Sequence, residues 1–336
     1  MIDLSLDEVH QARQRIRGTA LHTPLVPSPF LSARTGHDVL LKLEIAQPVG
    51  AFKLRGAANA VFSLPPSVTG VTCCSTGNHG RGVAFAARKR AVRAVVCMSK
   101  LVPQSKVDGI RALGSEVRIF GASQDDAQAE CARLARDEGL IEVSPFDDPK
   151  VIAGQGTIGL ELLEDRPDLA TILVPLSGGG LAGGIALAIK SLRPGVRIIG
   201  VSMDRGTAMH LSLAAGHPVE VEEVPSLADS LGGGIGQNNR LSFPLCRDYL
   251  DATLLVTEEE IYRALQAIYY EDRLVCEGGS AVGVAALLAG KAAGIAGPVA
   301  VIVTGRNIDM KMHADIMRGK KIRLGKTTLK GRRYGA

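Results

Sequence analysis

Residues 171–183 read Thr-Ile-Leu-Val-Pro-Leu-Ser-Gly-Gly-Gly-Leu-Ala-Gly, an apolar run that ends in three consecutive glycines. The run Thr171–Pro175 predicts a buried strand, and Leu181–Ser191 after it predicts a helix. Short apolar runs and helical patterns alternate in this way over most of the chain, which favours an α/β fold with largely parallel sheets. We also expect strands at Val39–Leu43, Gly70–Cys74, Arg93–Met98, Glu116–Phe120, Arg197–Ser202, Ala252–Val256 and Val299–Thr304, and helices at Gly80–Lys89, Ser105–Leu113, Ser123–Glu138 and Glu258–Glu271.

Prolines divide the chain near residues 66 and 147, at Pro65-Pro66 and at Pro145 with Pro149. The length of 336 residues is enough for two domains. We therefore expect a small substrate-closing domain over 70–147, inserted into a large domain formed by 1–69 and 148–322. From about Arg323 the apolar periodicity is lost, and we expect 323–336 to be an unstructured basic tail.

Composition and charge exclude several classes of protein. The net charge is +5, but residues 318–336 hold eight Lys or Arg and no acid, so the remainder carries about −3 and no nucleic-acid partner is expected. No apolar run reaches transmembrane length, and Ser5 with Glu8 predicts a helix start in place of a signal segment. The six cysteines lack metal or redox spacing, so we expect a cytoplasmic protein with reduced thiols and no metal.

The glycine run after Thr171–Pro175 predicts a phosphate site. Gly178, Gly179 and Gly180 leave their backbone N–H groups bare at the start of a helix, where the helix dipole favours an anion. The same stretch also fits G-x-G-x-x-G through Gly183, with Asp204 further along the chain. A dinucleotide-binding oxidoreductase therefore stays open as an alternative.

A second segment, Gly50-Ala51-Phe52-Lys53-Leu54-Arg55-Gly56-Ala57, places a lysine directly after an aromatic residue and among small residues. Close packing can strip water from the ammonium of Lys53 and lower its pKa, and only the neutral amine attacks a carbonyl. The ring of Phe52 offers a flat surface for another ring to lie against. The alternative is an ordinary solvated lysine.

Two further polar segments follow predicted strands. Ser75-Thr76-Gly77-Asn78-His79-Gly80 could bind a carboxylate at a helix start, and the Asn78 amide could donate to a ring hydroxyl. His79 is more typical of a structural ring in such a turn than of a general base. In Thr304-Gly305-Arg306-Asn307, the threonine hydroxyl could hydrogen-bond a heteroaromatic nitrogen. Each segment could instead simply cap the helix that follows it.

Taken together and in their order along the chain, the four segments resemble the fold-type II pyridoxal-phosphate enzymes, in the threonine/serine dehydratase and serine racemase branch. The resemblance covers nearly the whole chain. It includes Thr23-Pro24-Leu25, Lys42-Leu43-Glu44, Phe146-Asp147-Asp148-Pro149, Gly154-Gln155-Gly156-Thr157-Ile158-Gly159 and Asn307-Ile308-Asp309. It implies two three-layer αβα domains like those of the tryptophan synthase β subunit, pyridoxal 5'-phosphate as cofactor, a small amino-acid-like substrate and a homodimer.

The resemblance also implies a role for each site residue. Lys53 and Thr76 are the expected catalytic residues, the first as the Schiff-base lysine that later moves protons and the second where racemases use a serine. The expected cofactor contacts are Phe52 on the ring, Asn78 at O3′, Gly178, Gly179, Gly180 and Leu181 at the phosphate, and Thr304 at the pyridine nitrogen. The expected substrate contacts are Ser75, Thr76, Gly77, His79 and Arg306.

This chain departs from the family pattern near the substrate and near a metal site. Ser202 stands where many relatives carry an acid that helps to bind a divalent cation, and Arg306 replaces a glycine. Ser230–Gly236 lacks the usual Ala-Asp-Gly pattern, and Glu277-Gly278-Gly279-Ser280 lacks a common proline. These variants are most similar to the hydroxyectoine-utilisation dehydratases, so we expect β-elimination of water from a hydroxylated amino acid. Threonine, serine or 3-hydroxyaspartate dehydration, racemisation, and a binding protein without turnover remain alternatives.

Overall fold

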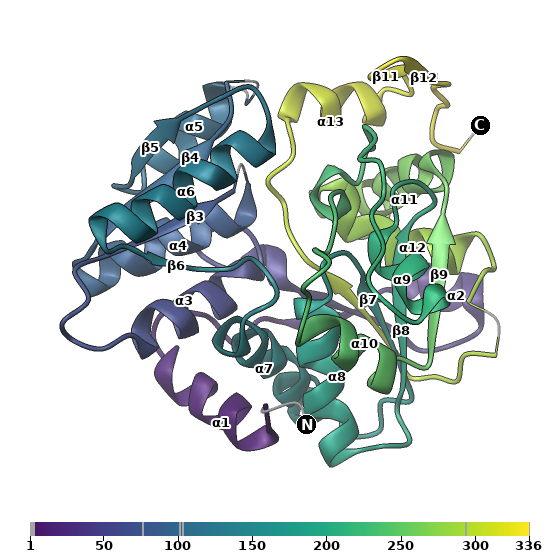
Figure 1. Ribbon diagram of the computed structural model, residues 1–336. Coiled ribbons are helices and arrows are strands. Elements are labelled where there is room, and N and C mark those ends of the chain that lie inside the picture. Colours follow the sequence, from purple (N-terminus) through teal and green to yellow (C-terminus); the bar gives the residue numbers. More distant parts are fainter. Residues whose placement is uncertain (1–3, 76, 101, 103, 293, 336) are drawn as a thin grey trace.

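The computed structural model describes residues 4–75, 77–100, 102, 104–292 and 294–335. It contains two largely parallel sheets, each covered by helices on both faces (Figure 1). The strand order of the larger sheet is β1-β2-β10-β7-β8-β9, and every neighbouring pair is parallel except β1 with β2. Its strands are β1 (Leu25–Pro27), β2 (Val39–Leu43), β7 (Thr171–Pro175), β8 (Arg197–Met203), β9 (Ala252–Val256) and β10 (Val299–Val303).

The smaller sheet is entirely parallel, with the order β5-β4-β3-β6. Its strands are β3 (Gly70–Cys74), β4 (Arg93–Met98), β5 (Glu116–Ile119) and β6 (Ile141–Glu142). The sequence predicted the main strands of both sheets closely. The short strands β1 and β6 were missed, because three and two residues are too few to show a periodic pattern.

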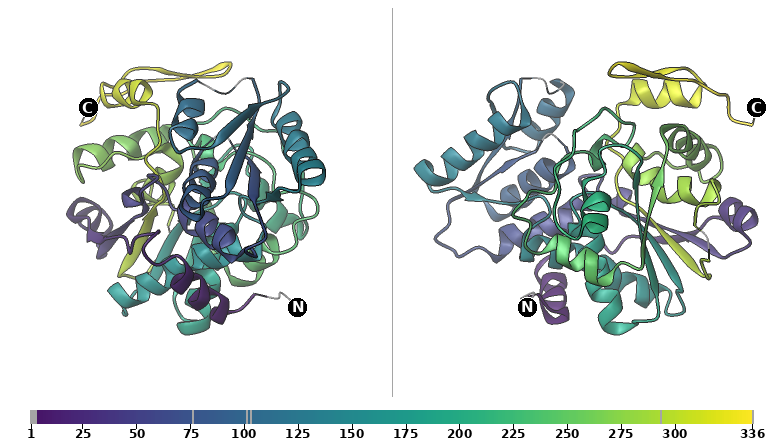
Figure 2. Two further views of the ribbon diagram at one scale, coloured as in Figure 1. Left: turned by 90° about the vertical axis from the view of Figure 1, so that its left-hand side faces the viewer. Right: turned by 45° about the vertical axis from the view of Figure 1, so that its right-hand side comes forward.

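Helices enclose the sheets on both faces, as the two further views show (Figure 2). In the larger unit, α11 and α12 pack with one face of the sheet, while α7 and α8 pack with the other. In the smaller unit, α4 and α6 lie on opposite faces. The helices are α1 (Leu6–Arg15), α2 (Pro29–Thr35), α3 (Lys53–Ser63), α4 (Asn78–Arg90), α5 (Gln104–Arg111), α6 (Gln124–Glu138), α7 (Pro149–Asp165), α8 (Gly180–Leu192), α9 (Ala208–Ala215), α10 (Ser242–Tyr249), α11 (Glu258–Tyr270), α12 (Gly278–Leu288) and α13 (Met310–Met317), with short 3₁₀ turns η1 (Glu44–Ala46) and η2 (Asp229–Leu231).

The carboxyl ends of three strands carry the predicted site segments. The segments after β7 and β10 leave adjacent strands of the larger sheet, since Val301 of β10 pairs with Leu173 of β7. The segment after β3 leaves the smaller sheet and opens α4. Ligands of open parallel sheets bind beyond these carboxyl ends, so the fold brings the predicted segments to the edge where a ligand is expected.

Helix α7 holds together the two helices that begin at the site. A Cβ on Gly154 would lie 2.6 Å from the Arg55 carbonyl oxygen of α3. A Cβ on Gly156 would lie 2.8 Å from the Gly184 carbonyl oxygen of α8. Only glycine permits so close an approach of helix backbones. The glycines quoted from 154–159 therefore fix the first turns of α3 and α8 relative to each other.

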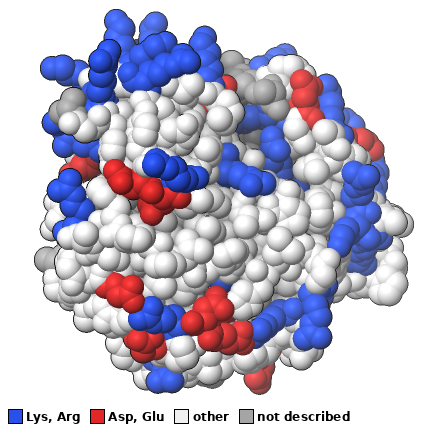
Figure 3. Space-filling view, turned by 180° about the vertical axis from the view of Figure 1, so that it is seen from behind, with Lys and Arg blue, Asp and Glu red and all other residues white. Residues whose placement is uncertain are grey.

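The expectation that the chain lacks structure from about residue 323 is wrong. Residues Ile322–Leu324 (β11) and Thr327–Leu329 (β12) form an antiparallel hairpin, and Leu324 and Leu329 are buried in the large core. Only three apolar side chains anchor the hairpin, too few to show a pattern in the sequence. The Lys and Arg residues of this segment remain outside and gather at the end of the molecule that carries α13 and the hairpin (Figure 3).

The smaller sheet lies within 70–147, as the domain prediction requires, but α3 packs its apolar face against the small unit and also contacts α7. The boundaries at 69 and 148 stay predictions. No helix among the described residues is long and apolar enough to cross a membrane.

Candidate active site

Lys53 is the first residue of α3, and its placement follows from the backbone on either side. The Phe52 N–H donates to the Thr304 carbonyl oxygen at 2.9 Å, and Ala51 forms a bridge with Gly305. The lysine segment is thereby tied to the end of β10. The Lys53 ammonium lies 5.3 Å from the centre of the Phe52 ring and donates to the Pro145 carbonyl oxygen at 2.6 Å.

The surroundings of the Lys53 amine make it unusually easy to deprotonate. Burial lowers the pKa of Lys53 from 10.5 to about 8, and the Glu277 carboxylate only partly opposes this shift. With a pKa of about 8, roughly one lysine in ten is neutral at pH 7. A lysine in this state can act as a nucleophile or as a base.

Residues 145–149 connect the lysine with the glycine segment. Pro145 accepts the bond from Lys53, and the next residue, Phe146, packs directly on Gly178 and Gly180. A Cβ on Gly178 would lie 2.4 Å from the Phe146 ring. Asp147 accepts backbone N–H groups at the start of α10, while Asp148 caps α7.

The glycine segment takes the form of a bare helix N-terminus. Gly179 has a φ of +87°, a conformation that other residues rarely adopt, and α8 begins at Gly180 without a side-chain cap. The Ser242 hydroxyl donates to the Gly178 carbonyl oxygen at 2.7 Å and holds the loop from outside. The first N–H groups of a helix have no partner inside it, so this loop can present them to a phosphate.

The hydroxyl of Thr304 is buried and belongs to a small cluster of neutral groups. It lies 2.8 Å from the Ser280 hydroxyl, which in turn contacts the backbone N–H and carbonyl of Gly305. Ser280 has one hydrogen to give, either to the Gly305 carbonyl or to Thr304. When it goes to Thr304, the threonine hydrogen is left for a ring nitrogen.

Asn78, the first residue of α4, lies against Glu277. Its Nδ2 donates to Glu277 Oε1 at 2.7 Å, and its Oδ1 accepts from Asn307 Nδ2 at 2.6 Å. Burial, and secondly Asp229, raise the pKa of the Glu277 carboxyl to about 7. Asn78, Ser230 and the Asn307 N–H donate to this carboxylate and moderate that rise.

The loop after β3 is held by hydrogen bonds between a side chain and backbone groups of the same loop. The Ser75 hydroxyl accepts the N–H groups of Gly77 and Gly80 at 3.3 and 3.1 Å, and space is open where a Gly77 side chain would stand. The buried ring of His79 donates through Nε2 to the Val143 carbonyl oxygen at 2.8 Å, while Nδ1 has no hydrogen-bond partner among the residues that the structure describes. Thr76 lies outside the described residues.

His79 is neutral at physiological pH. Burial lowers its pKa to about 3, and the nearby Lys53 charge adds to that effect. A ring with this pKa is a weak base at pH 7, which fits the structural role that the sequence favoured over general-base catalysis. Its contact with a substrate stays a prediction, as do those of Ser75 and Gly77.

Arg306 extends from the same turn as Thr304. Its backbone N–H donates to the Gly50 carbonyl oxygen at 2.9 Å, and its side chain runs over Gly50, next to Asn307. The residue is exposed. Within the described part of the chain, its guanidinium forms no ion pair with a carboxylate.

Glu277, Ser280 and Asn307 belong to the site, but the sequence had given none of them a role. All three lie in quoted segments, either in the departure at 277–280 or in the matching segment at 307–309. Their types and positions alone did not show that helices α4 and α12 and the end of β10 meet there. A buried acid at the cap of an apolar helix is the one local signal that could have drawn attention to Glu277.

These residues fit pyridoxal phosphate. The site offers a desolvated amine, an aromatic ring beside it, a glycine-lined helix N-terminus for the phosphate, a neutral hydroxyl and an oriented amide. Fold and site together define the class of pyridoxal-phosphate enzymes built on two parallel sheets.

Comparison with known proteins confirms this class. The family model described as pyridoxal-phosphate dependent enzyme matches residues 16–305, and the chain belongs to that family. A Sinorhizobium fredii protein provisionally named threonine dehydratase is 53% identical over 94% of this chain and 96% of its own. An L-threonine ammonia-lyase of Thermotoga maritima is 38% identical over 96% of this chain and 80% of its own.

Solved structures agree with the sequence relatives. The maize serine racemase matches with a TM-score of 0.89 and 32% identity, over 94% of this chain and 97% of its own. The processed threonine deaminase isoform 2 of Solanum lycopersicum matches with a TM-score of 0.85 and 33% identity, over 95% of this chain and 96% of its own. The chain is therefore a pyridoxal-phosphate-dependent lyase of the threonine dehydratase type, and the fold-type II prediction is confirmed.

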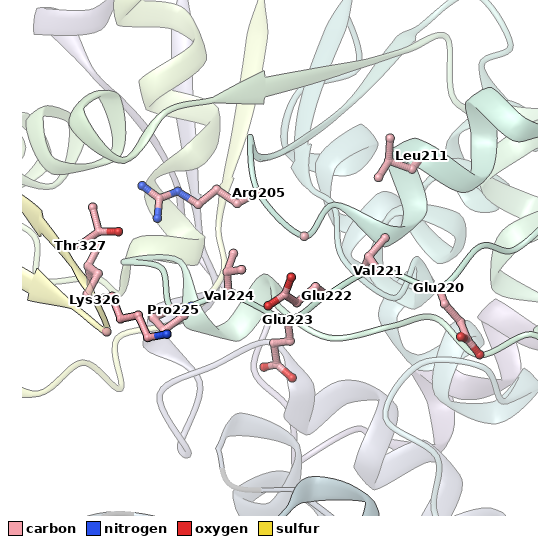
Figure 4. A pocket seen from close by; sticks show the side chains of 13 residues that line it. Arg205, Leu211, Glu220, Val221, Glu222, Glu223, Val224, Pro225, Lys326 and Thr327 are labelled. Atoms are coloured by element: carbon pink, nitrogen blue, oxygen red, sulfur yellow. The ribbon is translucent and has the colours of Figure 1, made fainter.

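Family membership removes the dinucleotide-binding alternative that Gly178, Gly180 and Gly183 had left open. The contact of the glycine segment with a phosphate stays a prediction. A separate pocket of about 800 Å³ lies between residues 205–206, residues 220–225 and the turn of the hairpin (Figure 4). None of the predicted site residues lines it. The described residues contain no group of three or more His, Cys, Asp or Glu arranged to hold a metal ion.

Proposed function

We propose that this enzyme removes water from a small β-hydroxy amino acid and releases a 2-oxo acid and ammonia. The observation that carries the proposal is the Lys53 amine, whose pKa is lowered to about 8 and which lies beside the Phe52 ring. It is hydrogen-bonded to Pro145, and the next residue, Phe146, packs on the glycine loop. The similarity to relatives that are named for this activity extends over nearly the whole chain.

Lys53 is the group proposed to move the α-proton. Bound pyridoxal phosphate supplies the sink for the electron pair that remains on the α-carbon once the proton leaves. The neutral Nζ of Lys53 accepts that proton. The β-hydroxyl then takes up one proton, which the resulting Lys53 ammonium can return, and leaves as water, so that Lys53 is neutral again. Hydrolysis of the resulting enamine, by way of the imine, gives the 2-oxo acid and ammonia.

The neutral surroundings of Thr304 favour elimination over slower carbanion chemistry. Thr304 and Ser280 are hydroxyls, and neither can keep a pyridine nitrogen protonated as a carboxylate partner does. The electron sink is then weaker, which favours prompt departure of the β-hydroxyl over transamination.

The proposal is tested with purified protein loaded with pyridoxal phosphate. We expect a visible yellow absorption band, 2-oxo acid and ammonia in equal amounts from the right β-hydroxy amino acid, and loss of both band and turnover in Lys53→Ala. A wild-type protein that stays colourless after incubation with the cofactor would contradict the assignment of Lys53.

For the substrate we propose a hydroxylated amino acid of hydroxyectoine catabolism, supported by Ser202, by Arg306 and by the segment Ser230–Gly236. The exposed guanidinium of Arg306, beside the site, favours 3-hydroxyaspartate as the second candidate, because its additional carboxylate would pair with an arginine. Threonine and serine complete the series of substrates to assay.

Racemisation is the competing activity, supported by the relative named serine racemase and by the position of Thr76 in the sequence. Optical rotation followed together with 2-oxo acid formation separates the two activities. Rotation lost without 2-oxo acid would assign the enzyme as a racemase.

We propose further that residues 70–147 close over the substrate and that the enzyme works as a cytoplasmic homodimer. The exposed pair Lys106 to Asp229, 3.3 Å apart, joins the small unit to η2 and supports closure. All six cysteines are buried and none is joined in a disulfide within the described part of the chain, which suits a reducing compartment. Light scattering of the purified protein measures the oligomeric state.

A further inference from the structure

The two ends of the Asn78 side-chain amide contact groups of opposite character. Nδ2 donates to the Glu277 carboxylate at 2.7 Å, and Oδ1 accepts from Asn307 Nδ2 at 2.6 Å. The two ends of an asparagine amide are nearly the same in shape, so the partners decide which end is oxygen and which is nitrogen.

Asn307 has no choice of orientation, because one of its bonds ends on the backbone. Its Nδ2 donates to the Val49 carbonyl oxygen at 3.0 Å, and a carbonyl oxygen can only accept. The nitrogen of Asn307 must therefore face Val49, and its second hydrogen points to Asn78. Asn78 in turn must offer its oxygen to Asn307.

The Glu277 carboxylate fixes the other end of the amide. In its ionised form, which predominates above its pKa of about 7, the carboxylate only accepts, so Asn78 must then turn its nitrogen toward Glu277. The Ser230 hydroxyl and the Asn307 backbone N–H hold this carboxylate as well. Gly305 leaves the necessary room, since a Cβ there would lie 2.8 Å from Glu277 Oε1 and 3.1 Å from Asn78 Nδ2.

We propose that Glu277 and Asn307 are positioning residues that lock the Asn78 amide in one orientation and leave its second Nδ2 hydrogen for the pyridoxal phosphate ring oxygen. The inference rests on the proposed contact between Asn78 and the cofactor. One chain of hydrogen bonds links four separate parts of the sequence, at Val49, Asn307, Asn78 and Glu277. Reversing its polarity at Asn307 should therefore turn Asn78 the wrong way.

The test measures the dissociation constant of pyridoxal phosphate and the wavelength of its bound absorption band, both independent of turnover. Asn307→Asp keeps the shape but places oxygen against the Val49 carbonyl and Asn78 Oδ1. We expect about tenfold weaker cofactor binding, equal to the loss of one hydrogen bond of about 1.4 kcal/mol, and a shifted band. Asn307→Ala should have a smaller effect, because Glu277 still orients the amide.

Asn59→Asp is the matched control. Asn59 is buried, and its Nδ2 also donates to a backbone carbonyl, that of Lys150 at 2.7 Å, but it does not contact Asn78. This variant should keep the wild-type dissociation constant within about twofold and leave the band unchanged. Thermal unfolding of each apoprotein separates loss of orientation from loss of fold, and Asn307→Ala remains informative should Asn307→Asp not fold.

A double-mutant cycle tests separately the orienting role of Asn307 and the contact of Asn78 with the cofactor. In an Asn78→Ala background, Asn307→Asp should have no further effect on cofactor binding or on the band. A full additional effect there would overturn the orienting role of Asn307. An Asn78→Ala protein that matches wild type in both measurements would instead overturn the cofactor contact of Asn78 itself, and with it the need for orientation.

Discussion

Lys53 and Arg55 stand two positions apart at the start of α3, and each holds a cation away from bulk water, with opposite results. Burial lowers the pKa of Lys53 to about 8, and the Glu277 carboxylate opposes this shift only in part. Burial also acts to lower the pKa of Arg55, but the Glu44 and Glu161 carboxylates more than offset it and leave the pKa raised.

The difference lies in the number of partners. The Arg55 guanidinium donates to both oxygens of Glu44 at 2.8 Å and to both oxygens of Glu161 at 2.6 and 2.8 Å. Lys42 adds a further contact to Glu161 at 2.8 Å. Among the described residues, the Lys53 amine has a single hydrogen bond, to a backbone carbonyl. A buried cation whose hydrogen-bond donors are all paired with carboxylates stabilises the fold. A buried cation with few partners keeps its reactivity.

Replacing Lys53 should give the largest change. In Lys53→Met we expect at least the 10²–10⁴-fold loss of turnover typical of a missing proton-transfer group, and no visible cofactor band. The apoprotein should nevertheless resist urea better than wild type at pH 7, because a poorly paired buried ammonium is removed. Lower stability in this variant would show that Lys53 is paired as Arg55 is.

Replacing Arg55 should have the opposite outcome. Arg55→Met leaves Glu44 and Glu161 without their main partner, which should lower the free energy of unfolding by about 3–5 kcal/mol in urea titrations of the apoprotein. Where cofactor still binds, its band should keep the wild-type wavelength. A loss below about 1 kcal/mol would show that the buried cluster stabilises little.

Comparing the pH dependence of the free energy of unfolding between wild type and Lys53→Met should isolate the contribution of Lys53. Between pH 8 and 10.5 the unfolded chain keeps a proton on this lysine that the folded protein has released. The free energy of unfolding of wild type should therefore rise relative to Lys53→Met as the pH increases through this window. A constant difference over that range would mean that the pKa of Lys53 is not lowered.

The smallest effect should come from an exposed copy of the Arg55 arrangement. Arg93 pairs with Glu116 and Glu138, both at 2.8 Å, but on the surface. Arg93→Met should therefore change the free energy of unfolding by no more than about 1 kcal/mol, and still less in high salt. An effect as large as that of Arg55→Met would show that number of partners, and not burial, sets the value of such a cluster.

Sequence alone predicted much of the fold and several residues of the candidate site. All strands of the two sheets except β1 and β6, the glycine loop at 178–180, Lys53, Asn78 and Thr304 were named from local patterns and from the family resemblance. Patterns of this kind can be recognised because strand periodicity and glycine loops are local in the chain. The hairpin at 322–329 was missed because its few apolar residues make no such pattern.

What the sequence determined by itself is the class of the protein and the presence of a lysine among small residues at a helix start. Only the tertiary structure decided which cation is reactive and which is structural, since Glu44 and Glu161 reach Arg55 from elsewhere in the chain. Likewise, Asn307 and Glu277 meet Asn78 across separations of 229 and 199 residues. The protonation of the Lys53 amine and the orientation of the Asn78 amide depend on the residues around them in space, and the tertiary fold determines which residues these are.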